Sequence, residues 1–185
     1  SLTGVTIPDS VTSIGISAFR GCTKLTDVVI GNGVTSIGDY AFSGCTSLTG
    51  VTIPDSVTSI SYGAFSGCTS LTDVVIGSGV TSIGNSAFSG CTGLTNVTLN
   101  SNSIVSSSRI GNIFGSQITT CIIGSGVTNI RDYAFIGCSK LSSIILSDTI
   151  TTIGVNPFSG CTSLPKVGDV QYADWYVSKG MSGYL

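Results

Sequence analysis

The chain repeats itself every 23 residues, and this period constrains its fold more than any other feature. An apolar residue opens each unit, and one extra residue breaks the spacing once; the opening residues are Leu2, Leu25, Leu48, Leu71, Leu94, Ile118, Leu141 and Leu164. A longer period lies beneath the short one, because residues 1–46 and 47–92 differ at only eight positions. Periods of roughly 20–50 residues are typical of solenoids, in which successive units stack around a shared core.

The start of each unit predicts a strand. In the first unit, Leu2, Val5 and Ile7 alternate with Gly4 and Thr6. Successive side chains of a strand leave opposite sides of the backbone, so the apolar set faces the core and the other set faces outward.

The rest of the unit predicts the return path of one coil. Pro8-Asp9-Ser10 indicates a turn, Val11–Gly15 a second extended segment, and Ala18–Cys22 a helical or 3₁₀ turn. A segment this short forms no stable helix alone. Neighbouring units must therefore cover both sides of each coil.

The repeated sequence IPDSVTSIGISAFRGCTKLT, residues 7–26, resembles the BspA-type, or Treponema pallidum-type, leucine-rich repeat. Six of the eight units keep the AF or PF followed by GC. The resemblance implies a leucine-rich repeat solenoid: a right-handed curved stack with a parallel β-sheet on the concave face and short extended segments and helical or 3₁₀ turns opposite. It also implies a secreted or surface-attached bacterial protein that adheres to host or microbial partners, and it supplies no catalytic residue.

The regular pattern breaks in the fifth unit. Residues 100–117 lack the AFxGC ending and contain the extra residue. We expect a bulged or looped coil in which Ile104, Ile110 and Phe114 replace lost core residues. A decayed repeat and a functional departure both explain this segment.

The pattern ends after Leu164, so we expect the solenoid to span residues 1–164. Residues 165–185 are expected to form a terminal cap or to start an irregular repeat, and an aromatic ligand platform is the alternative; this segment places Asp169 at a core position and concentrates Tyr172, Trp175, Tyr176 and Tyr184. Residues 163–176 also resemble a segment that interrupts repeats in gut-bacterial members of the family. Because the chain starts within a repeat, we expect a fragment or processed form of a longer protein.

Composition argues against several classes of function. Only 9% of the residues are charged, the net charge is −2, and no basic cluster is present, so nucleic acid and anionic membranes are poor partners. Histidine is absent, which removes the commonest general base and metal ligand together. No apolar run approaches the ~20 residues that a membrane-spanning helix needs. We expect a protein that is not an enzyme and has no cofactor and no metal.

Six cysteines occupy one position of the repeat, and Cys121 replaces a strand valine; the six are Cys22, Cys45, Cys68, Cys91, Cys138 and Cys161. Side chains in such a row run parallel instead of facing one another, which disfavours disulfides and metal sites. We interpret them as buried, reduced and structural. Disulfides remain the alternative, because export would permit them.

The outward strand positions predict the binding face. One row alternates hydroxyls with apolar groups, and a neighbouring row contains Asp27, Asp73 and Asn96. An apolar stripe with a polar rim is typical of protein-binding patches, although β-branched residues also favour strands for packing reasons. The candidate binding residues are Thr6, Asp27, Val29, Thr52, Asp73, Val75, Asn96, Thr98, Ile122 and Ile145.

We therefore expect a monomeric, extracellular or cell-surface module that adheres through its sheet face to a host or microbial protein or glycoconjugate. A structural spacer within a longer surface protein is the alternative. Asp27 and Asp73 recur two units apart, roughly 10 Å, which is too far to share one calcium ion and supplies no glycosidase pair. A threonine ladder over Thr12, Thr35, Thr58 and Thr81 is reminiscent of ice-binding solenoids but suits any sheet surface.

Overall fold

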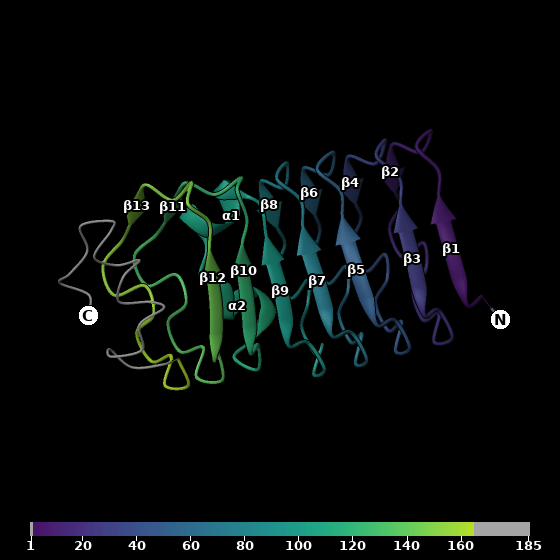
Figure 1. Cartoon of the computed structure of the whole chain (residues 1–185). Coiled ribbons are helices and arrows are strands. Elements are labelled where there is room, and N and C mark those ends of the chain that lie inside the picture. The colour runs from purple at the N-terminus through teal and green to yellow at the C-terminus, as the bar shows by residue number, and fades with distance from the viewer. Residues whose placement is uncertain (1, 165–185) are drawn as a thin grey trace.

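The computed structural model describes residues 2–164, which form one elongated stack of coils (Figure 1). Each of the seven units covered by these residues contributes one four-residue strand to a row along one face of the stack. In chain order, the row contains β1 (Gly4–Ile7), β3 (Asp27–Ile30), β5 (Gly50–Ile53), β7 (Asp73–Ile76), β9 (Asn96–Leu99), β10 (Thr120–Ile123) and β12 (Ser143–Leu146). The strands pair in parallel; β3 and β5 are neighbours, but the row divides between them into a two-stranded and a five-stranded sheet.

A second, shorter row of strands lies on the other side of the coils. It contains β2 (Ser13–Ile14), β4 (Ser36–Ile37), β6 (Ser59–Ile60), β8 (Ser82–Ile83), β11 (Asn129–Ile130) and β13 (Thr152–Ile153). In the fifth unit, α1 (Asn102–Ser107) takes the place of this strand, and α2 (Ile110–Phe114) takes the place of the AFxGC segment. The predicted leucine-rich repeat solenoid is confirmed, whereas the cap expected at residues 165–185 lies outside the described residues.

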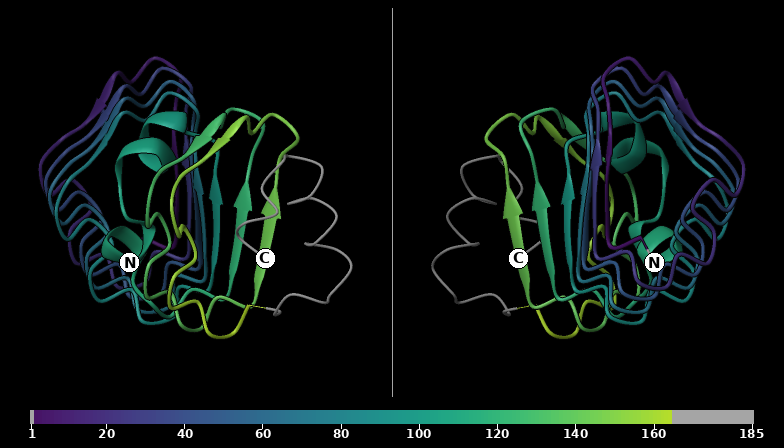
Figure 2. Two further views of the ribbon diagram at one scale, coloured as in Figure 1. Left: turned by 90° about the vertical axis from the view of Figure 1, so that its left-hand side faces the viewer. Right: turned by 90° about the vertical axis from the view of Figure 1, so that its right-hand side faces the viewer.

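Views along the stack show how the units follow one another (Figure 2). Successive coils do not superimpose in these views, because each coil is displaced from the preceding one in the same direction. The two helices lie on the side of the coil away from the long strands (Figures 1 and 2).

A continuous apolar core runs along the axis. The inward strand residues are buried, as in the third unit, where Leu48 and Ile53 are fully inaccessible. The phenylalanines of the first four units form a stack, with ring centroids of Phe19, Phe42, Phe65 and Phe88 separated by 5.1–5.2 Å and planes within 7° of parallel. Because each ring is covered by the rings of its neighbours, the core depends on the stack as a whole.

The AFxGC segment forms successive turns. Within it, N–H groups donate to carbonyls three residues earlier, as from Cys22 to Phe19. Left-handed backbone at Ser17 (φ 56°) and Gly21 (φ 71°) keeps these turns from joining into a continuous helix. Alternate N–H groups donate to the next unit, as from Phe42 to the Ala64 carbonyl at 2.7 Å.

Threonine hydroxyls connect the units on both sides of the coil. The Oγ1 atoms of Thr35, Thr58 and Thr81 each donate to the carbonyl of the equivalent threonine one unit earlier, at 3.0–3.1 Å. Each such bond stabilises the stack by about 1 kcal/mol. The threonine ladder noted in the sequence therefore has a structural role that needs no external ligand.

The turns after the long strands alternate between two kinds, which explains the 46-residue period. Asp9 of the first unit accepts a hydrogen bond from the Asn32 N–H of the second at 2.6 Å, and Asp55 accepts one from Ser78 at 2.6 Å. A Cβ on Gly33 would lie 1.7 Å from the Asp9 carbonyl oxygen. The Pro-Asp-Ser turns therefore require glycine-rich turns above them.

The fifth unit rebuilds the core with different residues. Ser101 caps α1 by accepting from the Ile104 N–H at 3.1 Å. Ile104, Ile110 and Phe114 are buried as predicted, and the Phe114 ring lies 5.0 Å from that of Phe88. Val105, which the sequence analysis did not single out, is fully buried as well.

Candidate binding face

The outward row of the long strands forms a ladder in register. Thr6 pairs with Val29, and the series Thr52, Val75, Thr98, Ile122 and Ile145 pairs strand by strand from β5 to β12. Val29 and Ile145 expose about half of their surface (50% and 55%) and Ile122 exposes 36%, whereas Val75 and Thr98 are half-buried. A discontinuous apolar stripe therefore faces outward along the sheet.

The neighbouring row carries the acidic residues. Asp73 pairs with Gly50 on one side and Asn96 on the other, and the Asn96 Nδ2 donates to its Oδ1 at 2.8 Å. Asp27 is exposed, and its carboxylate has no hydrogen-bond partner among residues 2–164. Of the two carboxylates, Asp27 is the one more open to an external ligand.

A shallow depression of about 700 Å³ crosses β3, β5 and β7. Gly50 and Thr52 of β5 lie between the larger Asp27 and Val29 of β3 on one side and their counterparts on β7 on the other. Because the two unit types alternate, the smaller residues of β5 lie lower than those of β3 and β7, which produces the depression. Three aspartates line the depression, Asp27, Asp55 and Asp73, and no lysine or arginine does.

The structure divides the ten predicted site residues into groups. Five of them line the depression, namely Asp27, Val29, Thr52, Asp73 and Val75. Thr6 lies on β1, and Asn96, Thr98, Ile122 and Ile145 extend the same face along β9, β10 and β12. Asp55 and Asn100 also line the depression, although neither was predicted as a binding residue. Asn100 directly follows β9, and Asp55 lies two residues after the end of β5, positions that could have suggested them.

Comparison with known proteins identifies the family to which the repeat belongs. The sequence pattern described as the BspA type leucine rich repeat region matches six copies over residues 1–113 and 109–168. The chain belongs to the BspA-type leucine-rich repeat family. The resemblance predicted from the sequence is thereby confirmed.

Solved structures agree with the BspA-type assignment. A T. pallidum leucine-rich repeat protein is 29% identical, with a TM-score of 0.64 over 97% of this chain and 84% of that one. A leucine-rich repeat protein from Bacteroides ovatus is 26% identical, with a TM-score of 0.59 over 94% of this chain and 51% of that one. One from Eubacterium ventriosum shares the fold at 21% identity and a TM-score of 0.55, with coverage of 91% and 61%. A comparison with curated proteins finds no match.

The cysteines of this BspA-type chain lie inside the stack. The thiols of Cys45, Cys91 and Cys161 each donate to the carbonyl of a phenylalanine 26 residues earlier, at 3.1–3.2 Å. Burial raises the pKa of Cys45 and Cys138 to about 11 and that of Cys161 to about 12. These groups are therefore poor nucleophiles at neutral pH.

Two features that could bind a metal ion or span a membrane are absent from the described part of this BspA-type protein. Residues 2–164 contain no group of three or more His, Cys, Asp or Glu side chains placed to hold a metal ion. Over the same residues, no helix has the length and apolar character needed to span a bilayer.

Proposed function

We propose that this protein is a non-enzymatic cell-surface binding module and that its sheet face engages a partner protein. The observation that carries the proposal is the depression over β3, β5 and β7, where exposed valine and three aspartates lie together. Apolar surface surrounded by polar groups is typical of protein-binding patches.

The charges of the depression favour a particular partner chemistry. Its three aspartates are exposed, and no lysine or arginine is among the lining residues. A lysine or arginine side chain of the partner would place its aliphatic stem against Val29 and Val75 and its charged end beside Asp27. We therefore propose a partner protein that presents basic residues on an extended segment.

Location and assembly follow from the same proposal. An extracellular or cell-surface position agrees with membership of the BspA-type family, and adhesion to host or microbial proteins agrees with an outward apolar stripe. We propose that the module acts as a monomer. A glycoconjugate ligand is distinguished from a protein by the binding experiment below.

The test is binding of the purified module to an array of extracellular-matrix proteins and glycans, followed by titration against each hit. The double variant Val29→Lys/Val75→Lys should weaken binding at least tenfold, because it places two positive charges in the depression. Ile16→Lys is the matched control, since Ile16 is 74% exposed and lies outside the sheet face. Circular dichroism and thermal unfolding establish that each variant folds.

A second pair of variants tests the partner chemistry. Asp27→Asn should weaken binding and reduce its dependence on salt, whereas Asp148→Asn, an exposed aspartate outside the depression, should do neither. Unchanged binding by the folded double-lysine variant would reject the sheet face. Unchanged adhesion of the parent protein after removal of a two-unit block would instead favour the spacer role.

A further inference from the structure

The AFxGC segments form a hydrogen-bonded ladder of their own. In the third unit, the N–H groups of Gly63, Phe65 and Gly67 donate to the carbonyls of Asn85, Ala87 and Ser89 in the fourth, at 2.8–3.2 Å. The first and second units make the same three bonds to the units that follow them. Each of these three units therefore uses three carbonyl oxygens of the unit that follows it.

The fifth unit does not supply these oxygens to the fourth. The N–H groups of Ser86, Phe88 and Gly90 occupy the equivalent positions, and none has a hydrogen-bond partner among the described residues. The physical reason is that α2 replaces the AFxGC segment, and the carbonyls of a helical turn are directed along its own axis. The interruption thus leaves a free hydrogen-bonding edge in the middle of the stack.

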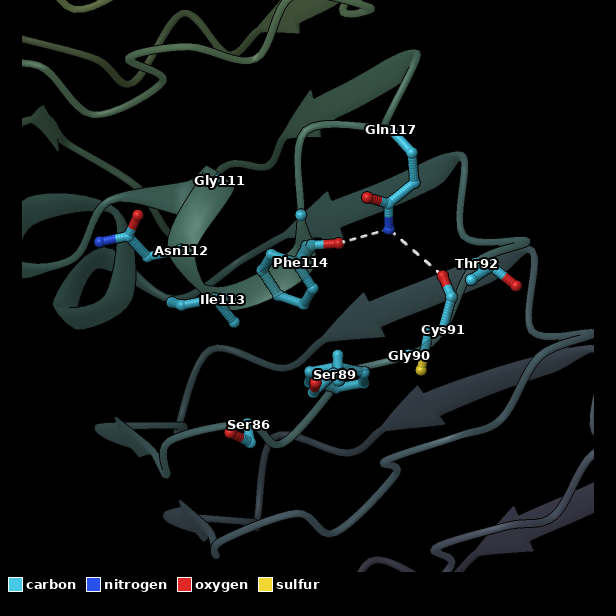
Figure 3. A pocket seen from close by; sticks show the side chains of 12 residues that line it. Ser86, Ser89, Gly90, Cys91, Thr92, Gly111, Asn112, Ile113, Phe114 and Gln117 are labelled. Carbon is cyan, nitrogen blue, oxygen red and sulfur yellow. Dashed lines mark hydrogen bonds between the residues drawn. The ribbon is translucent and has the colours of Figure 1, made fainter.

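The free edge opens onto a pocket. A cavity of about 310 Å³ lies between the fourth-unit segment and α2 (Figure 3). Ser89 and Gly90 are exposed here, whereas the equivalent Ser66 and Gly67 are half-buried under the next unit. The edge is therefore accessible from solvent.

The pocket is polar but uncharged. Its lining includes Ser86, Ser89, Thr92, Asn112 and Gln117, and no Asp, Glu, Lys or Arg. The Gln117 Nε2 donates to the carbonyls of Phe114 at 2.7 Å and Cys91 at 3.2 Å, which fixes one end of the pocket (Figure 3). The donors that remain are main-chain N–H groups at every second residue.

We propose that this pocket binds a short peptide segment of a partner protein, whose backbone completes the interrupted ladder. The required ligand presents carbonyl oxygens at alternate residues, as the regular units do with Asp39, Ala41 and Ser43. As in strand addition to a sheet edge, main-chain hydrogen bonds provide the affinity, and the neighbouring pocket selects side chains. The uncharged lining selects small or apolar side chains over acidic or basic ones.

This site is separate from the sheet face proposed above as the binding surface. It lies on the AFxGC side of the fourth and fifth units and shares no lining residue with the depression. Its occupation and the occupation of the sheet face can therefore be measured independently.

The probe is the acetylated and amidated peptide SYGAFSG, the sequence of residues 61–67, which supplies the three carbonyls to the second unit in the folded chain. Amide hydrogen exchange of the whole chain is followed by NMR with and without the peptide. In the free protein, the amides of Ser86, Phe88 and Gly90 should exchange at least tenfold faster than those of Gly63, Phe65 and Gly67. Saturating peptide should slow the first set at least tenfold and leave the second unchanged.

Two variants give independent readouts. Ser89→Trp should weaken peptide binding at least tenfold by filling the pocket, whereas Ser66→Trp, at the same position of an intact ladder, should leave it unchanged. Both should fold, because Arg20 and Ile136 are tolerated at this position in other units. Replacing residues 100–117 with residues 54–70 restores a regular fifth unit and should abolish binding while protecting the three amides.

The outcomes decide the proposal in either direction. Protection confined to the three amides and lost in Ser89→Trp supports it, provided that the same peptide made of D-amino acids, the control for chirality, gives no protection. Equal exchange of the two amide sets in the free protein overturns it, as does undiminished peptide binding by the variant with the restored fifth unit.

Discussion

The thiol of Cys68 donates a hydrogen bond to the carbonyl oxygen of Phe42, 26 residues earlier, with 3.2 Å between Sγ and oxygen. Cys45, Cys91 and Cys161 repeat this bond in their own units. Each of these thiols is thereby tied to the backbone of the preceding unit. The row therefore acts as a set of buried connections between units.

This arrangement predicts seven free thiols in the protein purified without reductant. Under native conditions at pH 8, iodoacetamide should modify Cys22 first, since it is half-buried while the other six are buried. The remaining six should react at least tenfold more slowly. Mass spectrometry of native and urea-unfolded samples measures both quantities, and an oxidised pair in the unfolded sample would contradict the structural interpretation.

The raised thiol pKa values predict a loss of stability at alkaline pH. Burial keeps Cys45 and Cys138 protonated to about pH 11 and Cys161 to about 12, whereas their ordinary pKa is 9.0. Their contribution is complete below pH 9 and is lost progressively as the pH rises from 9 to about 11 for Cys45 and Cys138 and to about 12 for Cys161, because the unfolded chain releases these protons first. Each thiol lowers the free energy of unfolding by at most about 1.4 kcal/mol per pH unit in this window.

Urea unfolding at pH 8, 9.5 and 10.5 measures this loss. The double variant Cys45→Ala/Cys161→Ala is the control, and its stability should fall less steeply with pH. An equal slope in the two proteins would show that other groups, such as tyrosines, dominate the alkaline transition.

The close approach of neighbouring turns predicts which glycines are essential. A Cβ at Gly79 would lie 1.9 Å from the Asp55 carbonyl oxygen, whereas a Cβ at Gly15 would meet nothing within 4 Å. Gly79→Ala should therefore destabilise the protein by about 3 kcal/mol through overpacking. Gly15→Ala should change the free energy of unfolding by less than about 0.5 kcal/mol. Chemical denaturation of both variants checks the difference, and equal stabilities would contradict the contact.

Much of the sheet face could be predicted because the two-residue alternation of a strand combines with the 23-residue repeat. Strand alternation assigned Val29 and Val75 to the outward face, and the 23-residue spacing aligned them along the sheet. The depression could not be predicted with the same detail, because its rim includes Asp55 and Asn100 from the turns that follow the strands. Their position depends on the path of the chain after each strand ends.

The fifth unit shows the limit of sequence patterns more clearly. The burial of Ile104, Ile110 and Phe114 was predictable from their spacing, but the helices α1 and α2 were not. Helices of six and five residues have little stability of their own and form through tertiary packing. The unpaired N–H groups of the fourth unit could not be predicted either, because the residue type does not indicate whether its backbone N–H has a hydrogen-bond partner.

The alternation of turns predicts that units can be removed only in pairs. Deletion of residues 25–47 would place Pro54, Ser56 and Ser61 above the first unit, where Gly31, Gly33 and Gly38 now approach its backbone. Deletion of residues 25–70 would instead place Gly77, Gly79 and Gly84 there and preserve the Asp9 acceptor for Ser78. The longer deletion should therefore unfold cooperatively and at the higher temperature, although solenoid stability normally increases with the number of units. Thermal unfolding followed by circular dichroism compares the two, and a higher midpoint for the single-unit deletion would show that the turns adapt to either neighbour.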